Sequence, residues 1–242
     1  MKLMITGVKG QLGKALFAMA PKEIEGEEIE TVGTSRTELD LSDKDACRSA
    51  IRIYQPDFLI NAAAYTAVDK AEEDSDLAFK INAEAPKVFA KELKDYGGKM
   101  IHISTDFVFS GKKGKPYKVN DLREPLGIYG SSKALGEDSI QEILGASKLG
   151  KVLRTSWLIG PTGKNFALTM LRLHKEQSKI SVMEDQIGSP TSTLSLAEVC
   201  WRLIELDLQK SPLSQSANIF HWSDAGVASW YDLAVAIKEI TL

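Results

Sequence analysis

The first two-thirds of the chain alternates short apolar runs with stretches in which apolar residues recur at helical spacing. The runs that favour β-strands are Lys2–Thr6, Glu30–Thr34, Asp57–Asn61, Lys99–Ser104 and Lys151–Trp157. The stretches that favour helices lie between them, near Gln11–Ala20, Asp43–Tyr54, Ser75–Tyr96 and Tyr129–Leu144. This alternation is typical of βαβ units, whose strands form a parallel sheet. The pattern predicts an α/β fold with a doubly wound parallel sheet.

Beyond Gly160 the pattern changes. It predicts a helix at Asn165–Gln177, a strand at Lys179–Glu184, a helix at Leu194–Leu208 and a last helix that begins at Ser229. We therefore expect a sheet domain of residues 1–158 and a smaller C-terminal lobe of residues 159–242. The chain stops at Leu242 inside an amphipathic helix without a capping glycine, so the lobe is expected to be incomplete at its C-terminus.

A glycine-rich segment, Gly7-Val-Lys-Gly10-Gln11-Leu12-Gly13, follows the first predicted strand and precedes the first predicted helix. Glycines at such a turn let the backbone approach a pyrophosphate, which the N-terminus of the helix then faces. The spacing is one residue longer in its first gap than the common fingerprint. The segment predicts a dinucleotide site, and the alternative is a tight turn without a ligand.

The ends of the second and third predicted strands carry further candidates for cofactor binding. An acidic residue that would bind a ribose 2′-hydroxyl is expected about 20 residues beyond the glycine turn, and Ser35-Arg36 stands there instead. Arg36 offers a planar cation for a 2′-phosphate, which favours NADP over NAD unless the side chain is only solvated. Asp40-Leu41 could meet the adenine, or Ser42 or Asp43 could simply cap the next helix. The small residues of Ala62-Ala63-Ala64-Tyr65 leave room for a ribose and pyrophosphate, as a close-packed turn also would.

Tyr129 and Lys133 are four residues apart on a predicted helix. At that spacing both side chains lie on one face, where an ammonium favours the phenolate and lowers the pKa of the phenol. The pair is suited to exchanging a proton with a carbonyl or alcohol oxygen while a nicotinamide exchanges a hydride. Thr105, just past the fourth predicted strand, is placed to bond the same oxygen. Without that context, a tyrosine and a lysine at this spacing are an ordinary exposed helix face.

Composition narrows the function classes. The net charge of the 242 residues is −3 and the charges are interspersed, so the chain has no basic patch for nucleic acid. The two cysteines, Cys47 and Cys200, and the three scattered histidines have no metal-ligand spacing, so no metal site is predicted. No apolar stretch reaches the ~18 residues of a membrane span. The chain begins directly with a strand pattern rather than a signal peptide, so we expect a cytoplasmic protein.

Several segments in register resemble the extended short-chain dehydrogenase/reductase family, and within it the reductases of 4-keto nucleotide sugars. The resemblance covers the whole chain and rests on Gly7–Gly13, Asn61–Asp69, Ser104–Gly111, Tyr129–Lys133, Arg154–Gly160, Asn165-Phe166 and Asp185–Thr191. It implies a Rossmann fold that binds NADPH, with NADH as the alternative cofactor. It also implies reduction of the 4-keto group of dTDP-4-dehydro-β-L-rhamnose by a monomer or a homodimer.

The resemblance assigns roles to individual residues. Tyr129 is then the proton donor, Lys133 holds the nicotinamide ribose and lowers the pKa of the phenol, and Thr105 polarises the carbonyl. The cofactor side comprises Gly7, Gly10, Gln11, Leu12, Gly13, Ser35, Arg36, Asp40, Leu41, Ala62, Ala63, Ala64 and Tyr65, with Tyr129 and Lys133. The substrate side comprises Thr105, Asp106, Phe107, Trp157, Asn165, Gln186 and Thr191, where Trp157 stacks on the sugar.

Departures from the family pattern limit what is carried over. Related dehydratases place an Asp-Glu pair after the threonine, whereas Asp106 is followed here by Phe107, which favours simple ketone reduction. Some members bridge a dimer through magnesium held by a glutamate just after the third glycine; Lys14 and Ala15 stand there, so magnesium dependence is not expected. Two alternatives remain: a non-catalytic regulatory subunit of the methionine adenosyltransferase type, and a reductase or epimerase of another nucleotide sugar.

Overall fold

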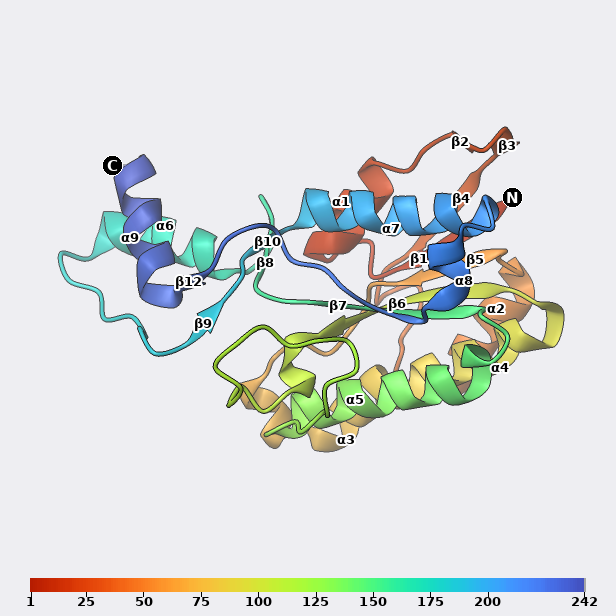
Figure 1. Cartoon of the computed structure of the whole chain (residues 1–242), viewed down its shortest axis with the longest axis horizontal. Helices are drawn as coiled ribbons and strands as arrows, with labels where there is room; N and C mark the ends of the chain where they lie inside the picture. Colours follow the sequence, from red (N-terminus) through yellow and green to blue (C-terminus); the bar gives the residue numbers. More distant parts are fainter. Residues whose placement is uncertain (242) are drawn as a thin grey trace.

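The structure is a computed structural model that describes residues 1–241, and it is built around a six-stranded parallel sheet. The strand order is β11-β7-β6-β5-β1-β4 (Figure 1). The bounds are β1 (Lys2–Thr6), β4 (Glu30–Thr34), β5 (Phe58–Asn61), β6 (Lys99–Thr105), β7 (Gly150–Thr155) and β11 (Ile219–His221). The chain turns back at β1, which pairs with β4 on one side and β5 on the other. Doubly wound sheets bind ligands at such a reversal, beyond the carboxyl ends of the strands.

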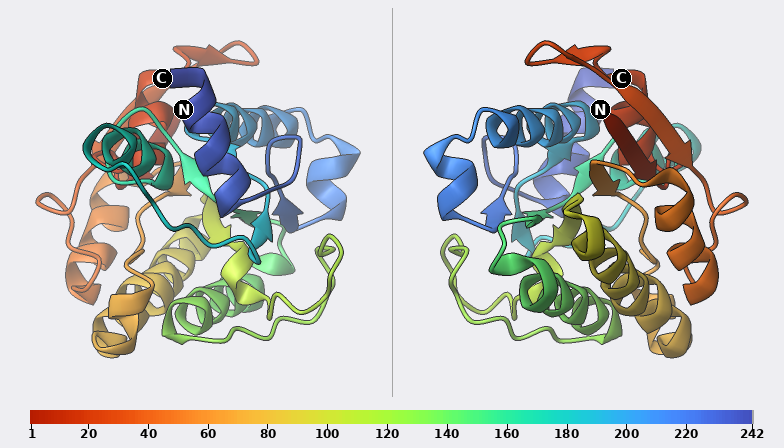
Figure 2. Two further views of the ribbon diagram at one scale, coloured as in Figure 1. Left: turned by 90° about the vertical axis from the view of Figure 1, so that its left-hand side faces the viewer. Right: turned by 90° about the vertical axis from the view of Figure 1, so that its right-hand side faces the viewer.

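Helices cover both faces of the sheet. Figures 1 and 2 show α1 (Gln11–Ala18) and α7 (Thr193–Leu208) on one face, and α2 (Lys44–Tyr54), α4 (Ala85–Tyr96) and α5 (Ile128–Ile140) on the other. Alternate side chains of β1 supply both cores: Leu3 and Ile5 pack in the cluster of α1 and α7, and Met4 packs in the cluster of α2 and α4. The predicted doubly wound α/β fold is confirmed.

The long helix expected over Ser75–Tyr96 is interrupted. It divides into α3 (Ser75–Phe79), one turn of π-helix (Lys80–Glu84) and α4. The widened turn carries the buried Asn82, whose side chain bonds both the N–H and the C=O of Tyr65 and the hydroxyl of Ser132. A π-turn often marks a functional region, and here it ties the loop after β5 to α5.

Most of the remaining segments form a small lobe beyond the carboxyl ends of the strands (Figure 1). The lobe contains α6 (Phe166–Glu176), α9 (Trp230–Thr241) and two short ladders, β8 (Leu158–Ile159) with β10 (Thr191–Ser192) and β9 (Ile187–Gly188) with β12 (Ala228–Ser229). Outside it lie a hairpin of β2 (Glu23–Ile24) and β3 (Glu27–Glu28) and the short helix α8 (Pro212–Ser216).

Two expectations for the C-terminal part need correction. Residues 179–184 do not form a strand, because alternating apolar residues need a sheet edge to pair with; one backbone bond, from Tyr231 N–H to Met183 O, joins this segment to α9. The sheet domain also extends past residue 158, since α7 packs against α1 and β11 pairs with β7. Residues 193–221 therefore pack with the sheet, and the elements beyond the carboxyl ends of the strands come from the stretches of chain before and after them.

Candidate active site

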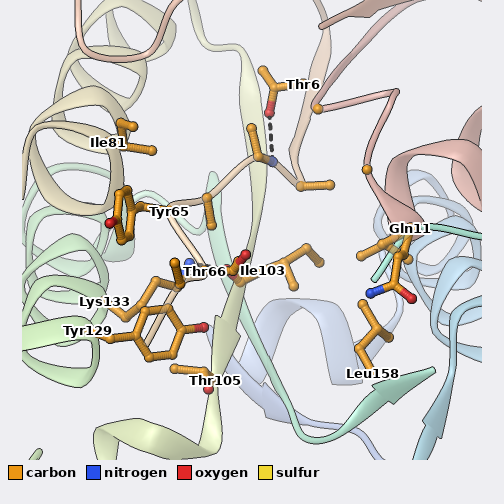
Figure 3. Close-up of a pocket in the computed structure, with 18 of the residues that line it drawn as sticks. Thr6, Gln11, Tyr65, Thr66, Ile81, Ile103, Thr105, Tyr129, Lys133 and Leu158 are labelled. Carbon is orange, nitrogen blue, oxygen red and sulfur yellow. Dashed lines mark hydrogen bonds between the residues drawn. The ribbon is translucent and has the colours of Figure 1, made fainter. Parts of the chain in front are cut away.

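A cavity of about 930 Å³ opens over the carboxyl ends of β1, β4, β5, β6 and β7. That volume lies at the upper end of the ~300–1,000 Å³ usual for ligand sites. Figure 3 shows Thr105, Tyr129 and Lys133 together on one wall and Gln11 and Leu158 on the opposite wall. The sheet thus brings segments from distant parts of the sequence to one hollow.

The glycine turn fits a dinucleotide. Gly7 has φ +74°, and a Cβ on it would lie 2.9 Å from Ala63 Cα, so only glycine allows this approach of two backbones. A Cβ on Gly13 would lie 2.0 Å from Gly7 O, so this glycine serves the packing of α1 rather than the cavity wall. Gly10 precedes α1 without a side-chain cap, which leaves the N-terminal N–H groups of α1 facing the cavity for an anion.

The end of β4 contributes Ser35, Arg36, Asp40 and Leu41 to the same cavity. Arg36 is exposed and free to meet a phosphate, and Ser35 is buried. The Asp40 carboxylate already accepts bonds from the N–H and hydroxyl of Ser42, at 2.9 and 2.8 Å, and these bonds lower its pKa. The helix cap that the sequence left open is made by Asp43, whose carboxylate accepts the N–H groups of Asp45 and Ala46 at the start of α2.

The loop after β5 lines the cavity with Ala62, Ala63, Ala64 and Tyr65, as expected. Ala63 N–H donates to Thr6 Oγ1 at 3.2 Å, a bond drawn in Figure 3. The phenol of Tyr65 donates to Asp74 at 2.9 Å and so faces α3. The small side chains leave the backbone of this loop open to a ligand.

Thr105, Tyr129 and Lys133 all line one end of the cavity. Tyr129 and Lys133 lie on α5, and Thr105 ends β6. Lys133 is 2% exposed, and its Nζ donates to Ile103 O at 2.6 Å and lies 3.3 Å from His102 Nε2. Burial lowers the pKa of Lys133 to about 8, and the charge of Glu137 opposes that shift. The ammonium is thus held against β6.

The expectation that Lys133 lowers the pKa of Tyr129 is wrong for this structure. Burial raises the pKa of Tyr129 to about 12, the hydroxyl of Thr105 lowers it in part, and the charge of Asp106 adds to the rise. A lysine that is itself desolvated and bonded to Ile103 O stabilises a phenolate less than an ammonium directed at the ring. The phenol is consequently protonated at neutral pH, which suits a proton donor.

Asp106 and Phe107 lie in the cavity wall beside Tyr129. Asp106 is half-buried, burial raises its pKa to about 6, and it accepts a hydrogen bond from Thr105 Oγ1 at 3.1 Å. The Phe107 ring stands edge-on to Tyr129, with centroids 5.5 Å apart. Both residues therefore border the expected reaction point.

The other residues assigned to the substrate are placed differently. Trp157 lines the cavity but stacks on Trp230 of α9, with centroids 3.5 Å apart and planes within 8°. Asn165, Gln186 and Thr191 do not line it: Asn165 Nδ2 donates to Gln11 Oε1 at 2.7 Å, and Gln186 accepts from Trp230 Nε1 at 3.1 Å. Thr191 is fully buried in β10 of the lobe. The sequence pointed to Trp157 as a substrate-side residue, but it did not show that Trp230 covers one face of the Trp157 ring.

Within residues 1–241, no group of three or more His, Cys, Asp or Glu side chains is arranged to hold a metal ion. In the same part of the chain, no helix has both the length and the apolar character needed to cross a bilayer.

Comparison with known proteins decides the family. The model of the RmlD substrate binding domain family matches residues 1–241. The chain belongs to this family. The dTDP-4-dehydrorhamnose reductase of Aggregatibacter actinomycetemcomitans and the spore coat polysaccharide biosynthesis protein SpsK of Bacillus subtilis are each 37% identical to it, over 98% of this chain and 78% of theirs. The crystal structure of dTDP-4-dehydrorhamnose reductase from Bacillus anthracis in complex with NADP superposes with a TM-score of 0.86 at 36% identity, over 99% of this chain and 80% of that chain.

The fold of this RmlD-family chain places three residues at the site that the sequence did not reveal. His102 and Asn61 are buried behind Lys133, and Glu38 accepts the backbone N–H of Ser35 at 2.7 Å beside Arg36. Only the Ser-x-x-Glu spacing of residues 35–38, typical of a capped turn, could have pointed to Glu38. Nothing in the linear pattern links Asn61 to His102.

Proposed function

We propose that this chain is an NADPH-dependent reductase that converts dTDP-4-dehydro-β-L-rhamnose to dTDP-L-rhamnose. The observation that carries the proposal is the meeting of the glycine turn, Tyr129, Lys133 and Thr105 at one cavity. Membership of the RmlD family and the likeness to reductases, one of them solved with NADP, support it.

The cofactor is assigned to the half of the cavity formed by the sheet. The pyrophosphate fits over the glycine turn and the N-terminus of α1, and Arg36 is the cation available for a 2′-phosphate. A cofactor bound there supplies the hydride. Lys133, whose ammonium donates to Ile103 O, keeps donor capacity for the nicotinamide ribose.

Tyr129 is assigned as the general acid. Its phenol holds its proton at neutral pH, because burial raises its pKa to about 12. As the carbonyl oxygen gains negative charge, the phenol donates its proton to that oxygen. The hydroxyl of Thr105 lies beside this point and polarises the same carbonyl.

The sugar and the dTDP group are assigned to the lobe side. Trp157 and Trp230 present aromatic surface at the cavity, and the loop before Asn165 lies over the glycine turn through Gln11. We propose that residues 159–192 and 222–241 act together as the substrate lobe, and residues 1–158 with α7 and β11 as the cofactor domain. With a cytosolic cofactor and a nucleotide sugar as reactants, we expect the reaction in the cytoplasm.

The direct test is spectrophotometric NADPH oxidation by the purified chain with dTDP-4-dehydro-β-L-rhamnose, beside a panel of other 4-keto dTDP, UDP and GDP sugars. The proposal expects turnover with the first and identifies the product as dTDP-L-rhamnose. Turnover with a different sugar only would reassign the substrate. Cofactor binding without turnover of any sugar would favour a regulatory subunit.

A further inference from the structure

A chain of buried polar groups runs from the catalytic lysine to the cofactor loop. His102 on β6 is fully buried, with Nε2 3.3 Å from Lys133 Nζ and Nδ1 3.0 Å from the amide nitrogen of Asn61 on β5. The amide oxygen of Asn61 lies 2.6 Å from Thr6 Oγ1 on β1. Thr6 Oγ1 in turn accepts the N–H of Ala63 at 3.2 Å. These hydrogen bonds connect two cofactor contacts, Lys133 and Ala63, behind the cavity wall.

Counting hydrogen atoms determines which group donates and which accepts at each of these hydrogen bonds. An ammonium can only donate. When Lys133 is charged, His102 Nε2 must therefore be an unprotonated acceptor, and the neutral ring carries its proton on Nδ1. Nδ1–H then requires an acceptor, so the amide oxygen of Asn61 faces it and the amide nitrogen donates to Thr6 Oγ1. Exchange of the amide oxygen and nitrogen leaves the shape of Asn61 unchanged.

When Lys133 is neutral, the same groups stay hydrogen-bonded with donors and acceptors exchanged. His102 Nε2–H then donates to the amine, the amide nitrogen of Asn61 donates to Nδ1, and Thr6 Oγ1 donates to the amide oxygen. The two polarities differ in the tautomer of His102 and in the orientation of one amide. The same neighbours stay hydrogen-bonded in both, with donor and acceptor exchanged, but the Thr6 hydroxyl hydrogen has an acceptor among these groups only when Lys133 is neutral.

Burial keeps His102 neutral and makes Lys133 the group that titrates. Burial lowers the pKa of His102 well below its usual range, and the Lys133 ammonium adds to that shift. Burial lowers the pKa of Lys133 to about 8, opposed by Glu137 on α5. Glu137 is itself paired with Arg154 of β7 and with Arg123. The groups contributed by β5 and β1, Asn61 and Thr6, carry no charge.

We propose that His102 is a positioning residue, whose neutral ring holds the Lys133 ammonium so that an N–H remains directed at the cavity. When Lys133 loses its proton, donors and acceptors exchange along the hydrogen bonds that join His102, Asn61 and Thr6. Two of the three ammonium hydrogens go to Ile103 O and His102 Nε2, which leaves one for the nicotinamide ribose. The role of the ammonium rests on the proposed function. The tautomer and its reversal are properties of the ligand-free protein.

The first test reads the tautomer by NMR of protein labelled with ¹⁵N-histidine. The chain has three histidines, so loss of one signal in His102→Gln assigns His102, and His174→Gln is the matched control. We expect a neutral Nδ1–H ring at pH 6.5 that converts to Nε2–H as pH rises through about 8. A charged ring, or Nε2–H at pH 6.5, overturns the proposal whether or not the protein reduces a sugar.

The second test separates positioning from packing. His102→Leu removes the acceptor, so kcat falls at least tenfold and the basic limb of its pH profile moves down by roughly one unit, the scale of one hydrogen bond to a charged group. His102→Gln supplies an amide oxygen as the acceptor, so it recovers most of kcat and returns the basic limb of the pH profile close to its wild-type position. Ile101→Val, a packing change on the same strand, leaves both unchanged. Equal losses in both His102 variants with no movement of the limb contradict the proposal; absence of turnover in the wild-type protein contradicts the proposed function instead.

Discussion

The two walls of the cavity are built in different ways. The sheet wall rests on parallel ladders, such as the six-pair ladder of β6 with β7, and on buried side-chain bonds such as Ser104 to Glu137. The lobe wall rests on two-residue ladders, on exposed residues such as Gln186 and Ile187, and on the stacked pair Trp157–Trp230. The sheet wall is therefore preorganised, whereas the lobe wall is held by fewer backbone pairs and can adjust its shape.

The largest effect is expected at the sheet wall, from Tyr129→Phe. The change keeps the ring against Phe107 and deletes only the acid, so kcat should fall by roughly 10²–10⁴ with NADPH affinity unchanged. Steady-state kinetics and calorimetric NADPH titration measure the two quantities. Tyr96→Phe, which removes a phenol bonded to Pro56 O outside the cavity, is the control. If Tyr129→Phe keeps more than a tenth of kcat, Tyr129 is not the proton donor.

The next effect concerns Arg36, also on the sheet wall but exposed. Arg36→Ala should cost NADPH roughly 1.5–3 kcal/mol of binding free energy, the scale of a hydrogen bond to a charged group, and leave NADH binding almost unchanged. Calorimetry with both cofactors measures the difference. Equal losses for the two cofactors would show that Arg36 does not recognise the 2′-phosphate.

The contrast between the walls also explains what the sequence could predict. Strands β1 and β4 were predicted to the residue, β1 because a buried parallel strand appears as a short apolar run. The glycine turn, Thr105, Tyr129 and Lys133 were predicted together because each follows a strand or lies on a helix of a regular pattern. The lobe was predicted less well: alternation at residues 179–184 did not reveal that no strand lies beside it. The pairings His102–Asn61 and Trp157–Trp230 join residues far apart in the sequence, so no local pattern encodes them.

A third prediction compares Asp106 of the sheet wall with a carboxylate of the lobe. Burial raises the pKa of Asp106 to about 6, above the ~4 of an exposed aspartate. The folded state therefore holds this proton more tightly than the unfolded chain, and the cost of ionising Asp106 is absent below pH 4, grows between pH 4 and 6 and is complete above pH 6. Relative to wild type, the Asp106→Asn variant should therefore gain about 2–3 kcal/mol of unfolding free energy between pH 4 and pH 7.5.

The matched change in the lobe is Asp232→Asn, which should behave in the opposite way. Hydrogen bonds from the backbone and hydroxyl of Ser229 lower the pKa of Asp232, so its carboxylate stabilises the fold above its unfolded pKa and loses that effect as pH falls. The variant should be less stable than wild type at pH 7.5 and approach it in acid. Urea unfolding at both pH values measures each difference, and a pH-independent difference for Asp106→Asn would contradict its raised pKa.

The smallest effect is expected at the lobe wall, from Trp230→Leu. The change removes the ring that covers Trp157 and the bond to Gln186, and an aromatic stack contributes about 0.5–1.5 kcal/mol beyond its buried area. If the stack orders Trp157 for the sugar, KM for the keto-sugar nucleotide should rise about 2–10-fold, with kcat and NADPH affinity nearly unchanged. Trp222→Leu, which alters a tryptophan outside the cavity, is the control. A lower KM in Trp230→Leu would mean that the stack closes the sugar site and must open for substrate, so that the adaptable wall opposes binding rather than supporting it.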